Sequence, residues 1–558
     1  MDVHSCQHQS YDSYAASNEE KIVRPTADFP PSAWGDYFVS FPPSPYTLDK
    51  LSPRIEELKM EVKAMFDNLS GLAKTLSLVD DIQRLGLERQ FEKEIDESLR
   101  RIQGVYPDAG DMHIVALGFR LLRQQGYNVS TDVFDKYKDD EGKFKQELSC
   151  DAKGLLNLYE ASWLGTREEM VLDEALSFSR SHMEHHLSTV HTGNVLAAQI
   201  KRALEMPFHR GLRQIEARHY IKIYPEVDES SEVLLELAKL HCNLVQSQQL
   251  AELKALSIWW REMGLLEKLG FGRDRVVECH FWTSGAYFEP KYTTGRLIIS
   301  KMMLLLSTTD DMFDAYGTVE ELQLLTDVVQ RWDLENVGRL PNYMRVYLDF
   351  LKSFIKEAED ELARTGRLHL KHHLIESVKA CFRAYFEEAK WAGEDYTPTL
   401  DEYIRSSVVS VCYPLIISLS HIIMDEEVVE DVLDWYNRMT PVVEVSSLIA
   451  RLTDDVESYK SEQKRKHVAS GVQCYMNDNG VTEQEACAEI MKIVANAWKD
   501  MNKEWLNSCS SKKQFNMIAI DYARVIEVVY KHGDGYTDPW GDMKENLNLL
   551  LTHQFKIE

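Results

Sequence analysis

An apolar stretch that ends in three aspartates constrains this chain more than any other part of it. Residues 297–317 read LIISKMMLLLSTTDDMFDAYG, and the helix that they would form is apolar on more than one face. Such a helix must be packed over most of its circumference. Asp310, Asp311 and Asp314 stand at i, i+1 and i+4, which brings their carboxylates to one end and roughly one side of the helix.

Carboxylates that share the end of a buried helix repel one another. At about 5 Å and an effective dielectric constant of about 20, a pair costs about 3 kcal/mol, which a bound cation would offset. Hard divalent cations take oxygen ligands, and Mg²⁺ in particular is held by one or two carboxylates together with substrate phosphates. The spacing therefore predicts a site for Mg²⁺ and a diphosphate. The alternative is an acidic helix end exposed to solvent.

The overall charge limits the partners that such a chain can have. The 558 residues carry a formal net charge of −27, which disfavours nucleic acid and anionic membranes as partners. An anionic substrate would therefore depend on metal ions and on local arginines. The chain is also too long for one hydrophobic core, so two or more domains are expected.

Cysteine usage and the N-terminal residues favour a cytoplasmic protein. The nine cysteines are scattered, odd in number and never spaced C-x-x-C, as is typical of a reducing compartment without a zinc site. The first twenty residues include Asp2, Asp12, Glu19 and Glu20 but no arginine, unlike a signal or transit peptide. No apolar run reaches transmembrane length, so membrane insertion is not expected.

Residues 1–45 are expected to form an arm. They are polar and then punctuated by prolines, which exclude a regular helix. Arg24, Trp34 and Phe38 favour an arm that docks on the folded body.

Residues 46–230 follow the 3–4 spacing of amphipathic helices between short turns. Ser52 is a plausible N-cap and Pro53 a plausible first residue for the first helix. Asp80 and Asp81 lack a third acid and are expected on a surface helix.

A break near residues 222–232, KIYPEVDESSE, separates this half from residues 231–558, which are again helical. Gly317 is placed as a helix C-cap, and Thr318 to Glu321 has the spacing of a capping box for the next helix. No sustained alternation indicates a sheet, so the fold class is all-α with two helical domains.

A second row of oxygen ligands follows about 140 residues after the first. Residues 451–462 read RLTDDVESYKSE, so Asp454, Ser458 and Glu462 stand at i, i+4 and i+8 on one helix face. Together with the acids at 310–314, this row predicts two facing helices that hold several Mg²⁺ ions. A solvated helix face is the alternative.

Three arginines are candidates for binding a diphosphate. Arg273 and Arg275 share the short segment GRDRVVECHFW, and Arg451 is one turn before Asp454. The planar fork of a guanidinium matches phosphate oxygens. Ordinary surface arginines are the alternative.

A loop and several aromatic residues suggest a closed, cation-stabilising site. Residues 531–538 are rich in turns, and a long loop beside a site often serves as a lid. Aromatic π faces would stabilise a carbocation by about 0.5–2 kcal/mol each. The aromatic candidates are Trp282, Tyr413, Tyr530 and Tyr536. Core packing is the alternative for each of them.

The chain as a whole resembles the plant class I terpene synthases, and most closely the cytosolic sesquiterpene synthases. The resemblance runs from about Arg24 to the C-terminus. It rests on RPTADFPPSAWGD, LVDDIQRLG, RLLRQQGY, RDRVVECHFW, YFEPKY, DDMFDAYGT, RLTDDVESYKSE and DGYTDP, in this order.

This resemblance implies three parts of the chain with different tasks. Residues 1–45 would cap the active site, residues 46–230 would form a helical domain without activity, and residues 231–558 would form a catalytic helical barrel. The metal ligands that the resemblance implies are Asp310, Asp314, Asp454, Ser458 and Glu462.

The remaining site roles also come from the resemblance. The implied catalytic residues are Asp310, Asp311, Asp314, Arg273, Arg275, Tyr530 and Asp534, of which Tyr530 and Asp534 would handle protons late in the reaction. The implied substrate-binding residues are Arg273, Arg275, Arg451, Trp282, Ser410, Val411, Cys412, Tyr413 and Tyr536. Ser410 to Cys412 would form a helix break whose carbonyls steer the cation, and Pro414 would sharpen it.

Three positions depart from the family pattern. Arg24-Pro25 replaces the tandem arginine of plastid monoterpene enzymes, which favours a sesquiterpene role. Thr308-Thr309 replaces a branched apolar residue, which predicts a more polar wall at the site. Arg465-Lys466 stands where Arg-Gly is common.

The reaction expected from the resemblance is the ionisation and cyclisation of farnesyl diphosphate to a sesquiterpene hydrocarbon or alcohol, with release of diphosphate. Three Mg²⁺ ions are expected, Mn²⁺ could substitute, and the protein is expected to be a monomer. Monoterpene and diterpene synthases share these motifs and stay open as alternatives. A chain-elongating prenyltransferase normally carries two D-D-x-x-D motifs, which disfavours it here. A helical scaffold without activity is the alternative from another class.

Overall fold

The computed structural model describes residue 24 and residues 29–189, 194–424, 439–462 and 469–557. Within these ranges the side chains of residues 461, 462, 510 and 511 are not described.

The all-α prediction is confirmed, since the described residues contain helices and two isolated bridges but no strand. The helices of the N-terminal half are α1 (Leu48–Asp67), α2 (Leu72–Arg84), α3 (Glu92–Ile102), α4 (Met112–Gln124), α5 (Ala152–Ser162), α6 (Met170–Thr189), α7 (Val195–Glu205) and α8 (Arg213–Ile223).

The helices of the C-terminal half are α9 (Glu232–Met263), α10 (Leu265–Leu269), α11 (Val276–Ala286), α12 (Thr293–Ala315), α13 (Val319–Arg331), α14 (Asn342–Arg364), α15 (Lys371–Gly393), α16 (Leu400–Ser410), α17 (Tyr413–Met424), α19 (Pro441–Glu462), α20 (Gly471–Asn479), α21 (Glu483–Asn507), α22 (Ser510–Val529) and α23 (Asp542–Leu551). Short 3₁₀ turns join several helices, at η1 (Glu88–Gln90), η2 (Tyr106–Asp108), η3 (Thr131–Tyr137), η4 (Gln146–Cys150), η5 (Tyr224–Glu226), η6 (Pro290–Tyr292) and η7 (Leu368–Leu370).

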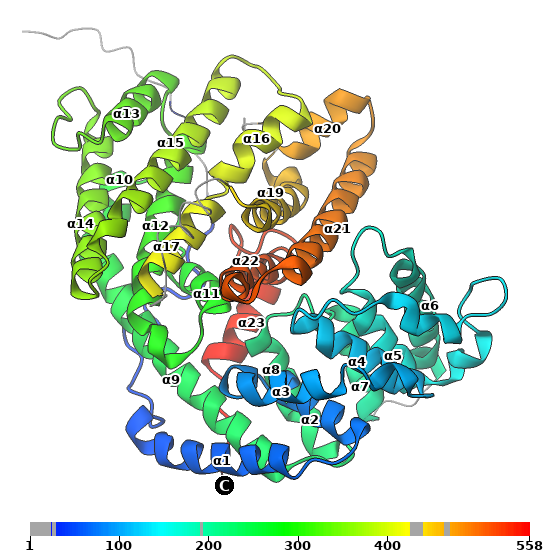
Figure 1. The fold of residues 1–558 in the computed structure, drawn as a ribbon. Coiled ribbons are helices and arrows are strands. Elements are labelled where there is room, and N and C mark those ends of the chain that lie inside the picture. The colour runs from blue at the N-terminus through cyan, green and yellow to red at the C-terminus, as the bar shows by residue number, and fades with distance from the viewer. Residues whose placement is uncertain (1–23, 25–28, 190–193, 425–438, 463–468, 558) are drawn as a thin grey trace, which may run out of the picture.

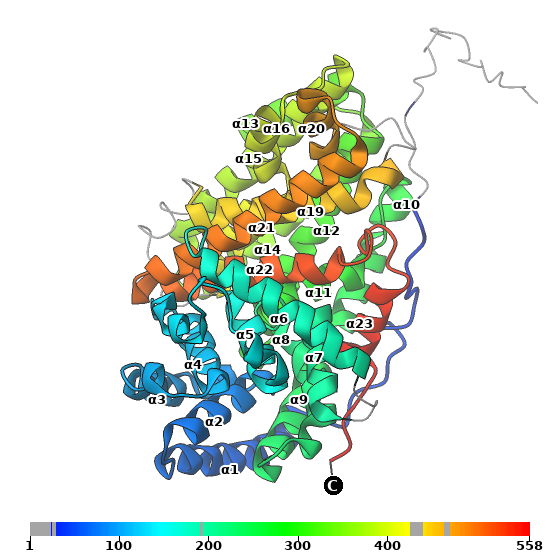
Figure 2. The ribbon, with the colours of Figure 1, turned by 90° about the vertical axis from the view of Figure 1, so that its right-hand side faces the viewer.

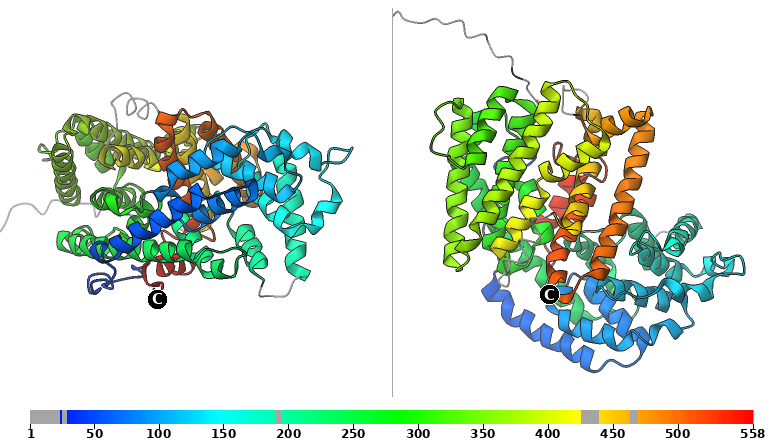
Figure 3. Two further views of the ribbon diagram at one scale, coloured as in Figure 1. Left: turned by 60° about the horizontal axis from the view of Figure 1, so that its bottom comes forward. Right: turned by 45° about the horizontal axis from the view of Figure 1, so that its top comes forward.

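The helices gather into two lobes. In Figure 3 (right) the green, yellow and orange helices of the C-terminal half stand side by side, and the blue and cyan N-terminal helices form a second lobe beneath them. One large apolar cluster fills the C-terminal lobe, and a second fills most of the N-terminal lobe.

Helix α12 has the burial that its sequence predicts. Most of its residues are buried, and from Met302 to Thr309 every residue is, so all faces of the helix are packed there. Five helices form a closed ring in which each packs on the next, in the order α11, α12, α17, α19 and α22 (Figure 1). The ring closes because α22 packs on α11. The acidic end of α12 is therefore fixed within the wall of a helical barrel.

The turn after α12 follows the predicted pattern with one change. The capping box of α13 is present, with the Thr318 hydroxyl accepting from the N–H of Glu321 and the Glu321 carboxylate accepting from the N–H of Thr318. Gly317, predicted as a C-cap, is not in the left-handed region. Its small size matters instead, since a Cβ there would lie 2.6 Å from Cδ2 of Leu322.

The first helix begins earlier than predicted. Helix α1 starts at Leu48, after the N-cap residue Thr47, so Pro53 lies inside the helix. Ser52 and Pro53 look like a helix start locally. The side chain of Leu51 packs against the N-terminal core, which favours extending the helix back past the proline.

The two lobes share helix α9. Its first part, from Leu234 to Leu244, belongs to the N-terminal core, and its second part, from Leu250 to Trp260, belongs to the C-terminal core. The chain does turn at η5 and Ser231, but core membership changes only in the middle of α9. The domain boundary at residue 230 stays a prediction.

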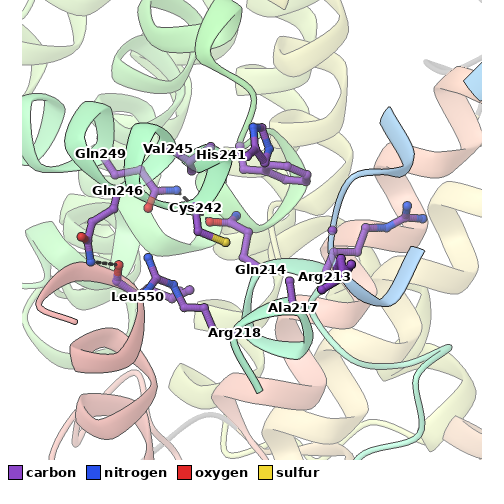
Figure 4. Close-up of a pocket in the computed structure, with 13 residues that line it drawn as sticks. Arg213, Gln214, Ala217, Arg218, His241, Cys242, Val245, Gln246, Gln249 and Leu550 are labelled. Atoms are coloured by element: carbon purple, nitrogen blue, oxygen red, sulfur yellow. Dashed lines mark hydrogen bonds between the residues drawn. The ribbon is translucent and has the colours of Figure 1, made fainter. Parts of the chain in front are cut away.

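The C-terminal tail also joins the lobes. The backbone N–H and carbonyl of Phe555 bond with the side-chain amide of Asn243, at 2.9 and 2.8 Å. Arg218 donates to the carbonyl of His553 at 2.7 Å, and Gln246 to that of Leu550 at 2.7 Å (Figure 4). The cavity beside these groups has a volume of about 20 Å³. That is room for one water molecule, so it is not a substrate site.

One stretch is long and apolar enough to cross a membrane by length and composition. It runs from Leu400 to Met424 through α16 and α17, and 83% of its most apolar window is buried inside the fold. The prediction that no apolar run reaches transmembrane length is therefore wrong. The burial of this stretch is that of a core helix pair.

The described part of the arm docks on the C-terminal lobe, as predicted (Figure 2). Arg24 forms a bidentate pair with Glu321, at 2.7 Å for both bonds, and lies over the rings of Tyr316 and Tyr343. Trp34 and Phe38 are buried in the C-terminal core. The arm thus reaches the turn that directly follows the acids of α12.

The prediction that Asp80 and Asp81 lie on a surface helix is wrong. Asp80 pairs with Arg84 and with the fully buried Arg120. Asp81 accepts hydrogen bonds from the hydroxyls of Tyr220 and Tyr224, at 2.9 and 3.1 Å. Burial, with the charge of Asp80 beside it, raises the pKa of Asp81 to about 7.

We expect Asp80→Ala to lower the free energy of unfolding by about 3–5 kcal/mol, because it leaves the buried guanidinium of Arg120 without its carboxylate. Urea denaturation of the full chain measures this loss. Asp360→Ala is the control, since Asp360 pairs with Lys356 at an exposed position and should change stability by about 0.5 kcal/mol at most. Equal effects of the two substitutions would contradict the expectation.

Candidate active site

The two acidic motifs meet in one region. Asp310 and Asp314 are half-buried at the end of α12. Burial, followed by the charge of the Asp314 carboxylate, raises the pKa of Asp310 to about 7. The guanidinium of Arg273 and the more distant one of Arg451 act in the opposite direction and lower this pKa. Arg451 belongs to α19, so the two helices bring their charged ends within electrostatic reach of each other.

Asp311 differs from its two neighbours because it is almost fully buried. Its carboxylate accepts the backbone N–H of Arg273 at 2.7 Å and pairs with Nε of the same residue at 2.7 Å. Arg273 also pairs with Asp310. The middle acid of the motif therefore positions the segment before α11, whereas Asp310 lies within electrostatic reach of Arg451 in the second motif.

The second motif also separates into two kinds of acid. Asp455 is buried and accepts from the hydroxyl of Tyr403 at 2.8 Å, from Nε of Arg451 at 3.0 Å and from the N–H of Gly471 at 3.0 Å. Asp454 is half-buried and pairs with Arg451. Asp455 thus holds α19 in place. Asp454 lies instead beside Arg451 and near Tyr530.

Of the two other predicted metal ligands in this motif, Ser458 and Glu462, the structure describes the side chain of Ser458 alone. Ser458 is buried on the same helix. The side chain of Glu462 lies outside the described residues, as do Arg465 and Lys466.

Sequence reasoning missed a further acid, Glu388 of α15. It is buried, and its carboxylate accepts from the hydroxyl of Ser410 at 2.6 Å. Burial raises the pKa of Glu388 to about 8, with Arg451, Asp314 and Asp455 close enough to act on it. Its position in FRAYFEEAKW carries no spacing signal, because only the packing of α15 beside α16 brings it to the site.

The donor set fits a hard divalent cation that a substrate helps to hold. Carboxylates and a hydroxyl from α12 and α19 are oxygen ligands of the kind that Mg²⁺ prefers. Within the described part of the chain, no three Asp, Glu, His or Cys side chains lie close enough to hold a metal ion by themselves. That is expected where phosphate oxygens supply the remaining ligands.

Arg273 and Arg275 occupy different surroundings. The guanidinium of Arg273 faces Asp310 and Asp311, donates to Oγ1 of Thr537 at 3.1 Å, and lies over the rings of Phe29 and Tyr536. Arg275 is fully buried and bonds to backbone carbonyls of the arm and of the 531–538 loop.

The aromatic candidates gather around Trp282. Its indole N–H donates to the hydroxyl of Tyr413 at 2.9 Å, which donates in turn to the carbonyl of Tyr522 at 2.9 Å. Edge-to-face contacts place the rings of Tyr536 and Tyr530 at 5.6 and 6.3 Å from Trp282. The structure therefore brings all four candidates together.

The lid candidate is folded against these aromatics. Oδ1 of Asp534 accepts the backbone N–H groups of Tyr536 and Thr537, at 3.1 and 2.8 Å, and so shapes the loop. Burial, with Asp454 and Asp534 nearby, raises the pKa of Tyr530 well above its usual value. A close backbone approach requires Gly535, whose Cβ would lie 2.5 Å from the carbonyl oxygen of Val529.

The predicted helix break is present. Helix α16 ends at Ser410 and α17 begins at Tyr413. Cys412 between them has a φ of 64°, which is left-handed and costly for a residue with a side chain. The thiol of Cys412 lies 3.2 Å from the carbonyl of Ser410 and 3.2 Å from the hydroxyl of Tyr385.

The threonines before the acids contribute less polarity than predicted. Both are buried, and their hydroxyls donate to carbonyls one turn earlier, Thr308 to Leu304 at 3.0 Å and Thr309 to Leu305 at 2.8 Å. Thr309 also lies 2.6 Å from the hydroxyl of Tyr347. The helix itself and a neighbouring tyrosine therefore satisfy these hydroxyls.

A buried carboxyl next to the site was also missed. Glu278 of α11 is fully buried, and neither of its oxygens accepts a hydrogen bond of normal geometry from a described residue. Burial raises the pKa of Glu278 to about 7, with the indole of Trp34 and the guanidinium of Arg275 close by. The arm thus covers a carboxyl whose protonated form is more favourable in the folded protein than in the unfolded chain.

Comparisons with known proteins agree with this geometry. Residues 33–204 match the model of the terpene synthase N-terminal domain, and residues 261–500 match that of the terpene synthase family metal binding domain. The chain is 42% identical to a beta-cubebene synthase of Magnolia grandiflora, over 95% of this chain and 97% of the relative. It is 42% identical to a (−)-germacrene D synthase of Vitis vinifera, over 95% and 96%.

Solved structures show the same architecture. A limonene synthase bound to 2-fluorolinalyl diphosphate superposes with a TM-score of 0.90, at 31% identity, over 96% of this chain and 100% of that one. The isoprene synthase of grey poplar, in complex with three Mg²⁺ ions and dimethylallyl-S-thiolodiphosphate, superposes with a TM-score of 0.85, at 33% identity, over 93% and 99%.

We expect Glu278→Gln to change how stability depends on pH. The folded protein holds this proton more tightly than the unfolded chain, where the pKa is near 4.5. The stability that the protonated carboxyl supplies is complete below about pH 4.5 and is lost as the pH rises to about 7. Glutamine stays neutral, so at pH 8 the variant should be more stable than the wild type by about 3 kcal/mol, and at pH 4.5 about equal to it.

Urea denaturation of both proteins between pH 4.5 and 8 measures this difference. The exposed Glu267, replaced by glutamine, is the control and should show no trend with pH. A stability difference for Glu278→Gln that is the same at both ends of the range would refute the assignment.

Proposed function

Because the chain belongs to the terpene synthase family, we propose that its C-terminal lobe ionises farnesyl diphosphate and cyclises the cation to a sesquiterpene hydrocarbon or alcohol, with release of diphosphate. The observation that carries this proposal is that Arg451, which pairs with Asp454 of α19, lies within electrostatic reach of Asp310 of α12. Arg273, which pairs with Asp310, lies over the ring of Tyr536, and that ring contacts Trp282. Relatives with about 40% identity over nearly the whole chain are sesquiterpene synthases by name, which supports the C15 substrate.

The matched metal binding domain supports the use of divalent metal ions. The proposal goes further, to three Mg²⁺ ions, with Mn²⁺ as a possible substitute. Their ligands would be Asp310, Asp314, Asp454, Ser458 and Glu462. When bound, Mg²⁺ neutralises the charge that develops on the diphosphate and so makes it a better leaving group.

Protein groups would complete the diphosphate site. Arg273 and Arg451 each pair with an acid of the motifs, so their guanidiniums are placed to donate hydrogen bonds to phosphate oxygens of a diphosphate bound to the metal ions that these acids would hold. Asp311 keeps Arg273 in this position through the backbone N–H bond. Arg275, also expected at the diphosphate, bonds to backbone carbonyls of the arm and of the 531–538 loop.

The hydrocarbon end of the substrate would meet a different set of groups. The faces of Trp282, Tyr530 and Tyr536 would stabilise positive charge. The break at Ser410, Val411 and Cys412 would turn carbonyl dipoles toward the cation. In this proposal Tyr530 and Asp534 handle the proton that is lost or moved late in the reaction.

The proposal includes the organisation and location of the protein. It has an arm in residues 1–45, an inactive helical domain in residues 46–230 and a catalytic domain in residues 231–558. We place it as a monomer in the cytoplasm, and the described cysteines, all free thiols, fit a reducing compartment.

A substrate series tests the proposal. Purified protein with farnesyl diphosphate and Mg²⁺ should release a C15 product that gas chromatography–mass spectrometry identifies, and removing Mg²⁺ with a chelator should abolish it. Geranyl and geranylgeranyl diphosphates are the controls, and a clear preference for one of them would make the protein a monoterpene or diterpene synthase. No product from any of the three, with folded protein, would favour a helical scaffold.

We expect Asp310→Ala to lower kcat by about a thousandfold or more, since it removes a ligand of the ion that stabilises the leaving group. The far-ultraviolet circular dichroism should stay unchanged because Asp310 is half-buried at a helix end. Asp349→Ala, at an exposed position of α14, is the control. Turnover at wild-type rates in Asp310→Ala would remove the acidic motif from the mechanism.

A further inference from the structure

Arg275 binds backbone carbonyls from separate parts of the chain. Its Nε donates to the carbonyl of Tyr536 at 2.8 Å, and its Nη2 to those of Thr537 at 2.6 Å and Pro30 at 2.8 Å. Its Nη1 donates to the carbonyl of Asp274 at 2.8 Å. The guanidinium thus joins the N-terminal arm to the 531–538 loop, two segments about 500 residues apart in the sequence.

These bonds distinguish Arg275 from Arg273. Arg273 pairs with Asp310 and Asp311, the acids of the first motif. The hydrogen bonds found for the Arg275 side chain within the described part of the chain all end on carbonyl oxygens. Of the two arginines, Arg273 faces the acids, and Arg275 is buried beneath the covering segments.

Arginine suits this position for a physical reason. A guanidinium presents five N–H donors in a rigid plane, so it can bind carbonyls that approach from different directions. A buried charge is tolerated only when its hydrogen bonds are made. If either the arm or the loop moves away, the guanidinium loses acceptors, and its hold on the other segment becomes less favourable.

The 531–538 loop is shaped to present these carbonyls. Asp534 accepts the N–H groups of Tyr536 and Thr537, and Arg275 binds the carbonyls of the same two residues. The backbone N–H and carbonyl groups of both residues are therefore satisfied when the loop lies on the site. The ring of Tyr536 meanwhile contacts Trp282.

The arm has its own contacts on either side of Arg275. Arg24 pairs with Glu321 at the turn after α12. Lys544, on the helix that follows the loop, donates to the carbonyl of Ala33 at 3.3 Å and lies over the ring of Trp34. Pro30 lies between these anchors, so Arg275 is the point where the arm and the loop are bound by one side chain.

We propose that Arg275 is a positioning residue that binds the arm and the 531–538 loop to each other, so that the two segments close over the site as one unit. The inference rests on the proposed function for its effect on products, because closure keeps water from the cation. It differs from the expected diphosphate contact, which is left to Arg273 and Arg451.

Three variants of the full-length protein test this role, namely Arg275→Met, Arg275→Lys and, as the matched control, Arg273→Met. The first measurement is the affinity for inorganic pyrophosphate in the presence of Mg²⁺, by calorimetry. Arg273→Met should weaken binding by about tenfold or more, since it removes charge-assisted bonds to the anion. Arg275→Met should stay within about threefold of the wild type. Equal losses in both variants would overturn the proposal and assign Arg275 to the diphosphate.

The second measurement is the product spectrum in ¹⁸O-labelled water. Arg275→Met should raise the share of acyclic alcohol that carries ¹⁸O several-fold, because an uncoupled cover admits water. Arg275→Lys should behave in the same way, since one ammonium cannot reach the carbonyls of both segments in a fixed plane. An unchanged product spectrum in both variants would overturn the proposal.

The third measurement does not need turnover, so it separates this inference from the proposed function. Hydrogen exchange of the amides in residues 531–541 is followed in the wild type, in Arg275→Met, in a chain that lacks residues 2–31, and in the combination. Removing the arm residues should speed exchange in the loop of the wild type and have little further effect in Arg275→Met. Additive effects would show that Arg275 does not couple the two segments, even if the protein makes a sesquiterpene.

Discussion

Like charges held at the end of a buried helix are the interaction on which the rest of the structure depends. Helix α12 is packed on all sides, so its terminal acids cannot move apart to relieve their repulsion. Asp310 lies within electrostatic reach of Arg451 of α19, and Asp314 within reach of Glu388 of α15. Two arginines, Arg273 and Arg451, compensate part of this charge in the protein alone. Divalent cations would balance the remaining negative charge and would also bind the anionic diphosphate.

The same acids organise the cover of the site. Asp311 is buried and fixes the backbone of Arg273. The segment from Arg273 to Arg275 is thereby fixed, and both the arm and the 531–538 loop bind to it. The short segment from Arg273 to Arg275 therefore connects the acidic motif of α12 with the arm and the 531–538 loop. Asp311 holds this segment, and for that reason its surroundings differ from those of Asp310 and Asp314.

Sequence patterns predicted those features that depend on neighbours along the chain. The burial of α12, the capping box at Thr318 and the helical course of α19 follow from local spacing, and the structure has them. The helix break before Tyr413, which the family resemblance implied, is also present. The predictions were wrong where contacts with residues distant in the sequence outweighed the local pattern. Pro53 resembles a helix start, but packing of the preceding turn extends α1. Asp80 and Asp81 look exposed, but Arg120 of α4 pairs with Asp80, Tyr220 of α8 donates to Asp81, and both acids are half-buried.

The sequence by itself determined the all-helical class and the identity of the two acidic motifs, because each is recorded in residue types at helical spacing. The family followed from the resemblance of several motifs in their order along the chain. Only the tertiary structure decided which acids face one another, that Glu388 and Glu278 lie beside the site, and that Arg275 meets the arm and the loop. The physical reason is that these contacts join residues from separate helices and loops. Their distances are set by how the helices pack around the barrel, and no spacing within one segment encodes them.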